Sequence, residues 1–113
     1  MKQGDIVLIT FPFTNLVSVK VRPALVISKP KFHAKSEDAI FIMITSNINH
    51  IRKEEIFLKR GNPNFAATGL KKESVIRIPK IYCLAKILAK RNLGSASPSL
   101  LKEVKQKLKD LFF

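Results

Sequence analysis

The sequence predicts a single mainly β domain, covering residues 1–113, that ends in one α-helix. Its length suits one domain, and its hydrophobic fraction of 46% is ordinary for a folded globule. Short apolar runs bounded by turn-forming residues fill the chain up to about residue 88, and an apolar repeat with helical spacing follows residue 97. A compact antiparallel sheet with a terminal helix packed against it accounts for both patterns.

Three apolar runs predict the strands of the first half. The runs are 6–13 (IVLITFPF), 21–28 (VRPALVIS) and 39–45 (AIFIMIT). They are almost continuously apolar and rich in β-branched residues, which indicates burial on both faces, as in a closed barrel or a dimer. Pro23 lacks the backbone N–H that a sheet ladder needs, so it predicts a sheet edge or a bulge at that point.

The second half predicts shorter elements. A connecting loop is expected at 30–38, and clustered Gly, Asn and Pro predict a turn at 61–64. Further runs predict a fourth strand at 56–58, a fifth at 74–79, and either a sixth strand or a short helix at 81–88.

The C-terminal segment predicts a helix. Ser97 before Pro98 is typical of a helix start, because serine caps the first turn and proline fits the first helical position. An apolar stripe with helical spacing follows, made of Leu101, Val104, Leu108 and Leu111. Lysines occupy the other faces of this helix, and we expect them to be solvated.

Positive charge is the most unusual property of the chain. Lys and Arg number 21 against eight Asp and Glu, which gives a formal net charge of +13 at pH 7. Such an excess favours a polyanionic partner, because each phosphate that a cation neutralises releases condensed counterions. A nucleic acid and an acidic protein both fit this description, and a plain lysine-rich surface is the alternative interpretation.

Composition disfavours several classes of protein. The chain has no signal-peptide pattern at its start and no apolar run long enough to span a membrane, so we expect a cytoplasmic protein without membrane contact. Its single cysteine, Cys83, is predicted to be a buried structural thiol. The two histidines, His33 and His50, are predicted to be exposed loop residues, and we expect no metal and no cofactor.

Two polar positions stand out in the apolar runs. Arg22 interrupts the second run, while Thr45, Ser46 and Asn47 close the third. A guanidinium is well suited to bind phosphate, and hydroxyls at a strand end are suitable donors to phosphoryl oxygens. The alternative is a structural ion pair between Arg22 and Asp5, together with an ordinary turn at the end of the strand.

These positions lie in segments that resemble the MazF/PemK family of toxins, the endoribonucleases of bacterial type II toxin–antitoxin modules. Five segments carry the resemblance in the family's order: 4–8 (GDIVL), 11–14 (FPFT), 20–28 (KVRPALVIS), 44–47 (ITSN) and 69–77 (GLKKESVIR). Each segment alone is a weak signal, whereas their shared order and spacing make the resemblance specific from about Lys2 to Leu111.

The resemblance implies a fold, partners and an activity. The fold is a small SH3-like barrel of the CcdB/PemK type with a C-terminal α-helix, and the partners are a second copy in a homodimer and an acidic antitoxin, with which the toxin binds DNA. The activity is growth inhibition by metal-independent cleavage of single-stranded mRNA, which leaves a 2′,3′-cyclic phosphate and a 5′-hydroxyl. The family's catalytic arginine matches Arg22, and its catalytic threonine or serine matches Thr45.

These residue types suit stabilisation of a transition state. Arg22 stays cationic and donates two hydrogen bonds at once, while Thr45 adds a neutral donor. A protonated guanidinium is a poor general base. Some family members carry a glutamate in the loop before the arginine, whereas 16–19 reads LVSV here, so the proton acceptor is left unassigned.

RNA binding is expected at a polar and basic rim around these two residues. Its predicted members are Phe13, Thr14, Lys20, Ser46, Asn47 and Lys80. Phe13 as plain core and the two lysines as solvated surface are the alternative interpretations. Two other functions are open at this point: a toxin of the same fold that poisons a protein such as gyrase, and a catalytically inactive module that binds RNA or antitoxin.

Overall fold

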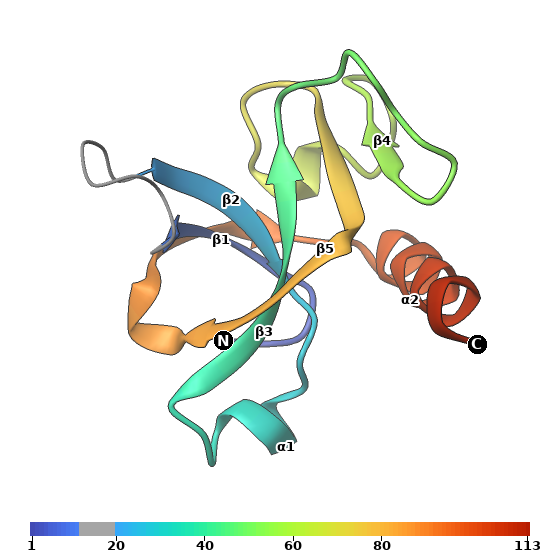
Figure 1. The fold of residues 1–113 in the computed structure, drawn as a ribbon. Coiled ribbons are helices and arrows are strands. Elements are labelled where there is room, and N and C mark those ends of the chain that lie inside the picture. The colour runs from blue at the N-terminus through green and yellow to red at the C-terminus, as the bar shows by residue number, and fades with distance from the viewer. Residues whose placement is uncertain (12–19) are drawn as a thin grey trace.

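The computed structural model describes residues 1–11 and 20–113 of the chain. Its strands are β1 (Asp5–Phe11), β2 (Lys20–Val26), β3 (Asp38–Thr45), β4 (Ile56–Leu58), β5 (Ser74–Ala85) and β6 (Ala89–Ser95). Its helices are α1 (Pro30–His33), α2 (Pro98–Phe112) and the short 3-10 turns η1 (Ala66–Thr68) and η2 (Lys86–Leu88). The six strands of the described residues form one antiparallel sheet in the order β4-β5-β3-β2-β1-β6 (Figure 1). The prediction of a mainly β domain with a C-terminal helix is confirmed.

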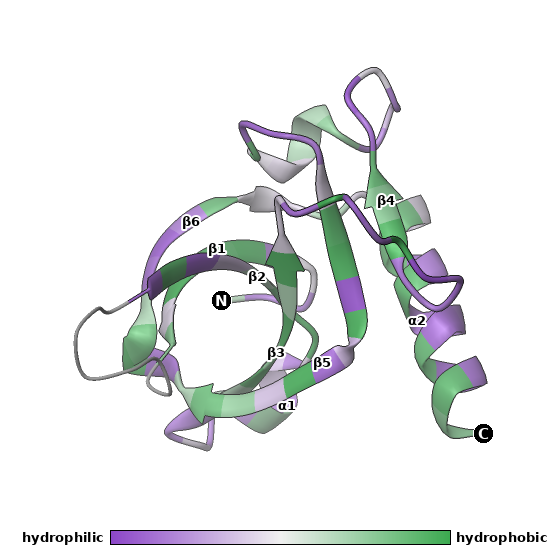
Figure 2. Cartoon of the chain, turned by 45° about the horizontal axis from the view of Figure 1, so that its top comes forward, coloured by the Kyte–Doolittle hydropathy of each residue, from purple (hydrophilic) through white to green (hydrophobic). Residues whose placement is uncertain are grey.

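The sheet curls into a half-barrel (Figure 2), and each of its faces buries a separate apolar core. The inner core lies within the curl and consists of Val7, Ile9, Phe11, Ala24, Val26, Ala39 and Phe41. The outer core lies between the sheet, β4 and α2, and consists of Ile6, Leu25, Ile42, Ile44, Ile56, Leu58, Phe65, Ile76, Ile78, Leu100 and Val104. Successive residues of one strand therefore enter different cores, which confirms the burial on both faces that the continuous apolar runs predict.

One long bent strand replaces the two elements predicted at 74–79 and 81–88. β5 pairs with β3 from Ala85 down to Ile81 and again from Ile76, but residues 77–80 between these stretches face the single residue Met43. The result is a wide bulge that contains Pro79, which cannot donate a ladder hydrogen bond. The predicted boundary between two strands is thus the bulge, and the predicted short helix is limited to η2.

The sequence analysis missed β6 and α1. β6 is polar and mostly exposed (AKRNLGS), so it has no apolar run to reveal it, and it is held by pairing with β1. α1 is one turn that begins at a proline inside the segment predicted to be a loop.

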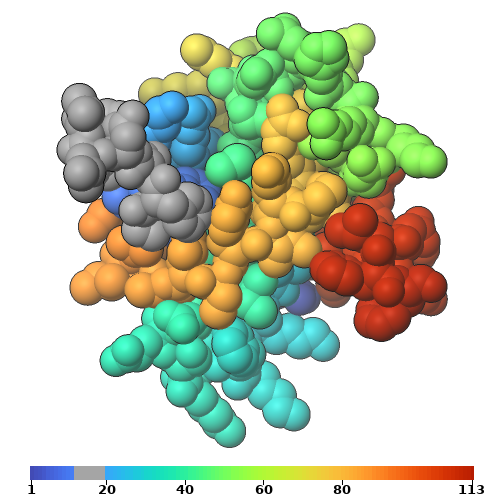
Figure 3. All heavy atoms as spheres, in the orientation of Figure 1, coloured from blue at the N-terminus to red at the C-terminus, as the bar shows by residue number. Residues whose placement is uncertain are grey.

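α2 begins where predicted, but its buried apolar face is rotated slightly from the predicted apolar stripe. The Ser97 side-chain oxygen accepts the Leu100 N–H at 3.2 Å, which is an N-cap. Leu100 and Val104 are fully buried, whereas Leu111 is 40% exposed. In the space-filling view the helix forms a ridge beside the loop after β3 (Figure 3), and the Nζ of Lys107 donates to a carbonyl of this loop at 2.6 Å. No helix among residues 1–11 and 20–113 combines the length and apolarity that crossing a bilayer requires.

The predictions for His33 and Cys83 are wrong. His33 is only 4% exposed, and its Nδ1 lies 2.9 Å from the Ser28 hydroxyl oxygen, which accepts the Ile40 N–H at 3.0 Å. The Met1 carbonyl can only accept, so the Nε2–H of His33 donates to it at 2.8 Å, and in the neutral imidazole Nδ1 then accepts the Ser28 hydroxyl proton. Cys83 is exposed, because its position on β5 faces outward and no element of residues 1–11 and 20–113 covers it. The exposed position predicted for His50 is confirmed.

This buried network makes a prediction about stability. Ser28→Ala leaves the Ile40 N–H and the His33 Nδ1 without their partner, and we expect the free energy of unfolding to fall by about 1–3 kcal/mol. Urea unfolding followed by circular dichroism measures the loss. Ser95→Ala, at an exposed position of β6, is the matched control and should leave the unfolding midpoint unchanged. Equal midpoints for the two variants would contradict the prediction.

Candidate functional site

The candidate site lies where β2 and β3 diverge (Figure 1). These strands pair at Ala24↔Met43, Leu25↔Ile42 and Val26↔Phe41, and the ladder ends there. Continued by two residues, the same register sets Arg22 opposite Thr45. Opposite residues of an antiparallel pair face the same side of a sheet, so both side chains belong to the face of the inner core, at its rim.

Arg22 is half-buried and has no ion pair with another residue of the described chain. The alternative partner, Asp5, is excluded by the register of β1 and β2. Arg22 lies opposite Ile9, so Asp5 is about 13 Å further along β1, and its carboxylate accepts the N–H of Lys2 at 2.8 Å. The ion-pair interpretation of Arg22 is therefore wrong, and its guanidinium is available for an external anion.

Pro23 explains how an arginine fits into this strand. Residues 20–23 of β2 pair with β1 but not with β3, so Pro23 stands at a local edge of the sheet, as predicted. Because β3 does not pair with this part of β2, the Arg22 guanidinium can extend from the apolar strand toward solvent.

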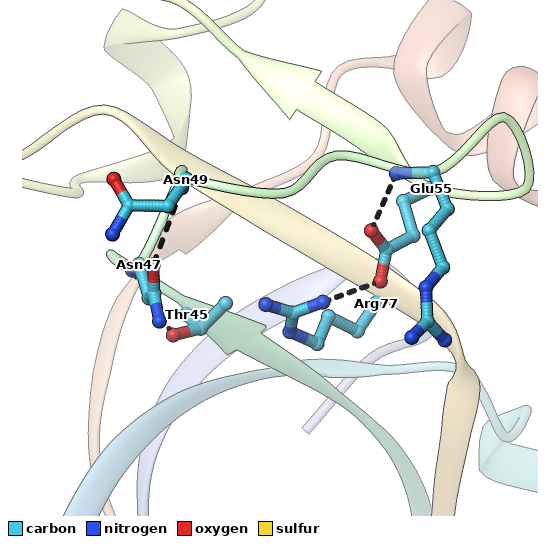
Figure 4. Close-up of polar contacts among 6 residues, drawn as sticks. Thr45, Asn47, Asn49, Glu55 and Arg77 are labelled. Atoms are coloured by element: carbon cyan, nitrogen blue, oxygen red, sulfur yellow. Dashed lines mark hydrogen bonds and ion pairs between the residues drawn. The ribbon is translucent and has the colours of Figure 1, made fainter.

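Thr45 ends β3 and organises the loop that follows. Its Oγ1 accepts the Asn47 N–H at 3.1 Å, and the side-chain oxygen of Asn47 accepts the Asn49 N–H at 3.2 Å (Figure 4). Because Oγ1 accepts in the first of these bonds, the hydroxyl proton of Thr45 is left for an external acceptor such as a phosphoryl oxygen.

An ion pair that the sequence analysis missed lies on the same side of β5. Thr45 is opposite Val75, so Arg77, two residues further along in the bulge, extends toward the same face (Figure 4). Its Nη1 lies 2.7 Å from Oε2 of Glu55, whose other oxygen accepts the Arg52 N–H at 2.9 Å. The Glu55 side chain is only 3% exposed and is held entirely by these partners. The signal that indicates Arg77 is the one used for Arg22: an arginine inside an apolar run, here SVIRIP.

The other predicted site residues lie around this end of the sheet. Ser46 and Asn47 follow Thr45 directly and are exposed, and Lys20 is the exposed first residue of β2. Lys80 is exposed in the bulge of β5. Two further predicted residues, Phe13 and Thr14, lie outside the described residues.

The divergence of β2 and β3 also opens a pocket of about 370 Å³, called the rim pocket here. Its walls come from β1, β2, the end of β3, the segment 69–74 and β6. It is lined by Leu8, Val21, Arg22, Pro23, Ile44, Ser46, Gly69, Leu70, Lys71, Lys72, Ser74, Arg91 and Leu93. Four of these side chains are cationic, and none is a carboxylate.

The back of the rim pocket is a tight junction between the segment after η1 and β6. A Cβ placed on Gly69 would lie 1.9 Å from the Leu93 carbonyl oxygen, and one on Gly94 would lie 2.3 Å from the Ala67 carbonyl oxygen. Gly69 also has a φ of 70°, which disfavours any other residue. The two backbones thus touch, and the pocket wall is built into the fold.

Solved structures of toxins share this fold. MazF from Deinococcus radiodurans is 22% identical and aligns with a TM-score of 0.76 over 98% of this chain and 94% of that one. A MazE–MazF structure from the same organism is 23% identical, with a TM-score of 0.77 and the same coverage. An endoribonuclease in complex with its cognate antitoxin, from a mycobacterial species, is 13% identical, with a TM-score of 0.76 over 97% and 92% of the two chains. A search of curated protein sequences finds no match to the chain.

The whole length of the chain also matches one family model. The model describes the PemK-like, MazF-like toxin of type II toxin–antitoxin systems, and its match spans residues 2–112. This span includes both strands of the candidate site and α2. The chain therefore belongs to the PemK-like, MazF-like toxin family of type II toxin–antitoxin systems.

Proposed function

We propose that this toxin is an endoribonuclease that cleaves single-stranded mRNA, with the 2′-hydroxyl of the substrate as nucleophile. The observation that supports the proposal is that Arg22 has no ion pair among the described residues and lies at the open end of the sheet, where the register of β2 and β3, continued two residues beyond its last pair, leads to Thr45. The similar mycobacterial protein is an endoribonuclease. The net charge of +13 supports a polyanionic substrate.

In this mechanism the protein stabilises charge and the RNA supplies the nucleophile. The 2′-oxygen attacks the adjacent phosphorus and loses its proton, the bond from phosphorus to the 5′-oxygen breaks, and that oxygen gains a proton. A 2′,3′-cyclic phosphate and a 5′-hydroxyl result. Arg22 donates two hydrogen bonds to the phosphoryl oxygens, whose negative charge increases in the transition state, and Thr45 donates one. Neither side chain is the proton acceptor, and Glu55 is already engaged by Arg77.

The rim of the site is proposed to bind the rest of the RNA. Ser46, Asn47, Lys20 and Lys80 are exposed polar or cationic side chains around the diverging strand ends. Hydroxyl, amide and ammonium groups of this kind bind phosphate and sugar oxygens. From the sequence alone, Phe13 and Thr14 join them, the former as a stacking platform for a base.

Two protein partners and a location complete the proposal. A similar MazF is known in structures with MazE, which supports an antitoxin as partner, and a positively charged toxin suits an acidic one. Together with that antitoxin the toxin would bind DNA. Apolar side chains such as Val21, Ile87 and Phe112 are 50% or more exposed, which supports burial against a second copy in a homodimer. We place this activity in the cytoplasm, where mRNA is accessible.

The arginine is tested by two substitutions. We expect Arg22→Ala to lower the rate of RNA cleavage by about 10²–10³, because one charge-assisted donor to the transition state is lost. Arg22→Lys should recover only part of the rate, since an ammonium cannot reproduce the two-pronged guanidinium. Single-turnover cleavage of a fluorescent RNA measures both. Lys102→Ala on α2 removes the same charge at a distance and should cleave at the wild-type rate; a similar rate for Arg22→Ala would contradict the assignment.

The threonine is tested by comparing two similar side chains. Thr45→Val removes the hydroxyl at nearly constant shape and should slow cleavage by less than the loss of Arg22, whereas Thr45→Ser should keep most of the activity. Thermal unfolding of both variants identifies any loss of the turn at Asn47. If Thr45→Val cleaves as fast as Thr45→Ser, the hydroxyl has no part in the reaction.

The chemistry is tested by removing metal ions. We expect cleavage of a long single-stranded RNA to continue in excess EDTA, because 2′-hydroxyl attack with Arg22 and Thr45 as stabilisers requires no metal. Mass spectrometry of the fragments should find 2′,3′-cyclic phosphate ends. A metal-dependent nuclease inhibited under the same conditions is the control. RNA that stays intact in EDTA and is cut after addition of Mg²⁺ would exclude the metal-free mechanism.

A further inference from the structure

We propose that Glu55 is a positioning residue for RNA cleavage, because its buried carboxylate holds Arg77 away from the substrate, so that the scissile phosphate binds at Arg22. This role rests on the cleavage of RNA proposed above. Glu55 touches neither the substrate nor the reacting atoms and acts only through Arg77, with which it is paired.

Arg77 lies where it can compete with Arg22 for a phosphate. β3 stands between β5 and β2 in the sheet, so the two arginines come from the two strands that flank β3. Ile76 and Ile78, on either side of Arg77, enter the outer core. Alternation along the strand therefore directs Arg77 to the opposite face, which is the face of Thr45. A phosphate at the end of β3 thus has two arginines within its surroundings.

The carboxylate of Glu55 is fixed on the far side of Arg77. Its Oε2 accepts the Arg77 Nη1–H at 2.7 Å, and its Oε1 accepts the Arg52 N–H at 2.9 Å (Figure 4). The Glu55 N–H donates back to the Arg52 carbonyl at 3.0 Å. Both carboxylate oxygens are therefore engaged, and a side chain that is 3% exposed has no room to release Arg77 by turning away.

Arg77 keeps donors that are not used. A guanidinium has five N–H groups, and the bond to Glu55 is the only hydrogen bond that the Arg77 side chain makes with the described residues. The side chain is 21% exposed, so an anion from solvent can reach it. The carboxylate cancels the charge of the guanidinium, and a neutral pair attracts a phosphate far less than a free cation does. Glu55 therefore decides whether Arg77 binds phosphate.

Stability alone does not account for this ion pair. Removing two charges from water costs about as much as their mutual attraction returns, and apolar residues of similar size often stabilise a protein equally well. An apolar residue would also suit the run SVIRIP, in which Arg77 is the only charged side chain. A pair of this kind is better explained by specificity, here the choice of the arginine that receives the phosphate.

Glu55→Gln tests the role in turnover. Glutamine keeps an acceptor for the Arg52 N–H but loses the charge that holds Arg77. The released guanidinium should capture RNA in a non-productive position, so that kcat and KM for a short RNA both fall about tenfold, the effect of one charge-assisted hydrogen bond, while kcat/KM stays unchanged. A merely structural defect would lower kcat/KM instead, because it weakens binding of the transition state.

Binding is measured separately with a fluorescent single-stranded RNA that carries 2′-O-methyl groups and cannot attack its own phosphorus. Glu55→Gln should bind this probe about tenfold more tightly, and the slope of log affinity against log salt should steepen by about 0.7, the value for one added phosphate contact. Glu103→Gln on the exposed side of α2 changes the net charge equally and is the matched control, for which neither quantity should change comparably. Unchanged or weaker binding by Glu55→Gln would overturn the proposal.

Two more variants test whether Glu55 acts through Arg77. Combining Glu55→Gln with Arg77→Gln should return kcat, KM and the salt slope to their wild-type values. Arg77→Gln alone should keep the wild-type salt slope, because Arg77 does not contact the RNA. Circular dichroism verifies that each variant is folded. If Glu55→Gln does not fold, Arg77→Gln decides: a shallower salt slope together with a loss of kcat/KM would mean that Arg77 binds the substrate, and the proposal would be wrong.

The binding measurements also separate this role from the proposed activity. Suppose that the wild type cleaves no RNA, while Glu55→Gln binds the probe more tightly and the double variant does not. The endoribonuclease would then be excluded, and Glu55 would remain the residue that keeps Arg77 from RNA. Cleavage by the wild type, with a lower kcat/KM and no tighter binding in Glu55→Gln, would do the reverse.

Discussion

The short ladder between β2 and β3 is the constraint on which the functional surface depends. Three described residue pairs join the strands before they diverge at Ala24 and Met43. If the ladder continued, Arg22 and Thr45 would form an ordinary cross-strand pair with Cβ atoms about 4.5–5.5 Å apart, and the sheet would be closed at this point. Divergence instead leaves both side chains at the rim of the inner core, and Arg22 also lines the rim pocket.

Two prolines stand at the irregular points of the sheet, and each accompanies an arginine. Pro23 follows Arg22 at the local edge of β2, and Pro79 lies two residues after Arg77 in the bulge of β5. Irregular pairing lets a charged side chain leave an otherwise apolar strand. The two arginines differ in their partners, because Arg77 is neutralised by Glu55 whereas Arg22 has no carboxylate among the described residues. One is therefore structural, and the other is free to bind.

Three of the eight acidic residues are engaged in local structure away from the rim pocket. Glu55 is held by Arg77, Asp5 accepts the Lys2 N–H, and Glu73 accepts the Arg60 N–H. Because these carboxylates serve local structure, they do not neutralise the cations around the rim pocket. The formal net charge of +13 therefore produces a positive electrostatic field that attracts polyanions.

The strands with apolar runs, the helix start at Ser97 and the two unusual polar positions can be predicted from the amino-acid order alone, because each of these has a local signal. An apolar run reports a buried strand, a Ser-Pro pair reports a helix start, and an arginine among aliphatic residues reports a special environment. The order of the motif segments also made the family recognisable from the sequence.

How these elements pair and pack depends on contacts between distant segments, which the folded chain reveals. β6 has no apolar run and exists because β1 offers it a free edge, and His33 is buried because Ser28 and Met1 supply its hydrogen bonds. The position of Arg22 and Thr45 at neighbouring strand ends depends on the pairing of two strands that are separated along the chain. The rim pocket depends on the contact between Gly69 and Leu93. Such pairings join distant segments, and no periodicity within one segment encodes them.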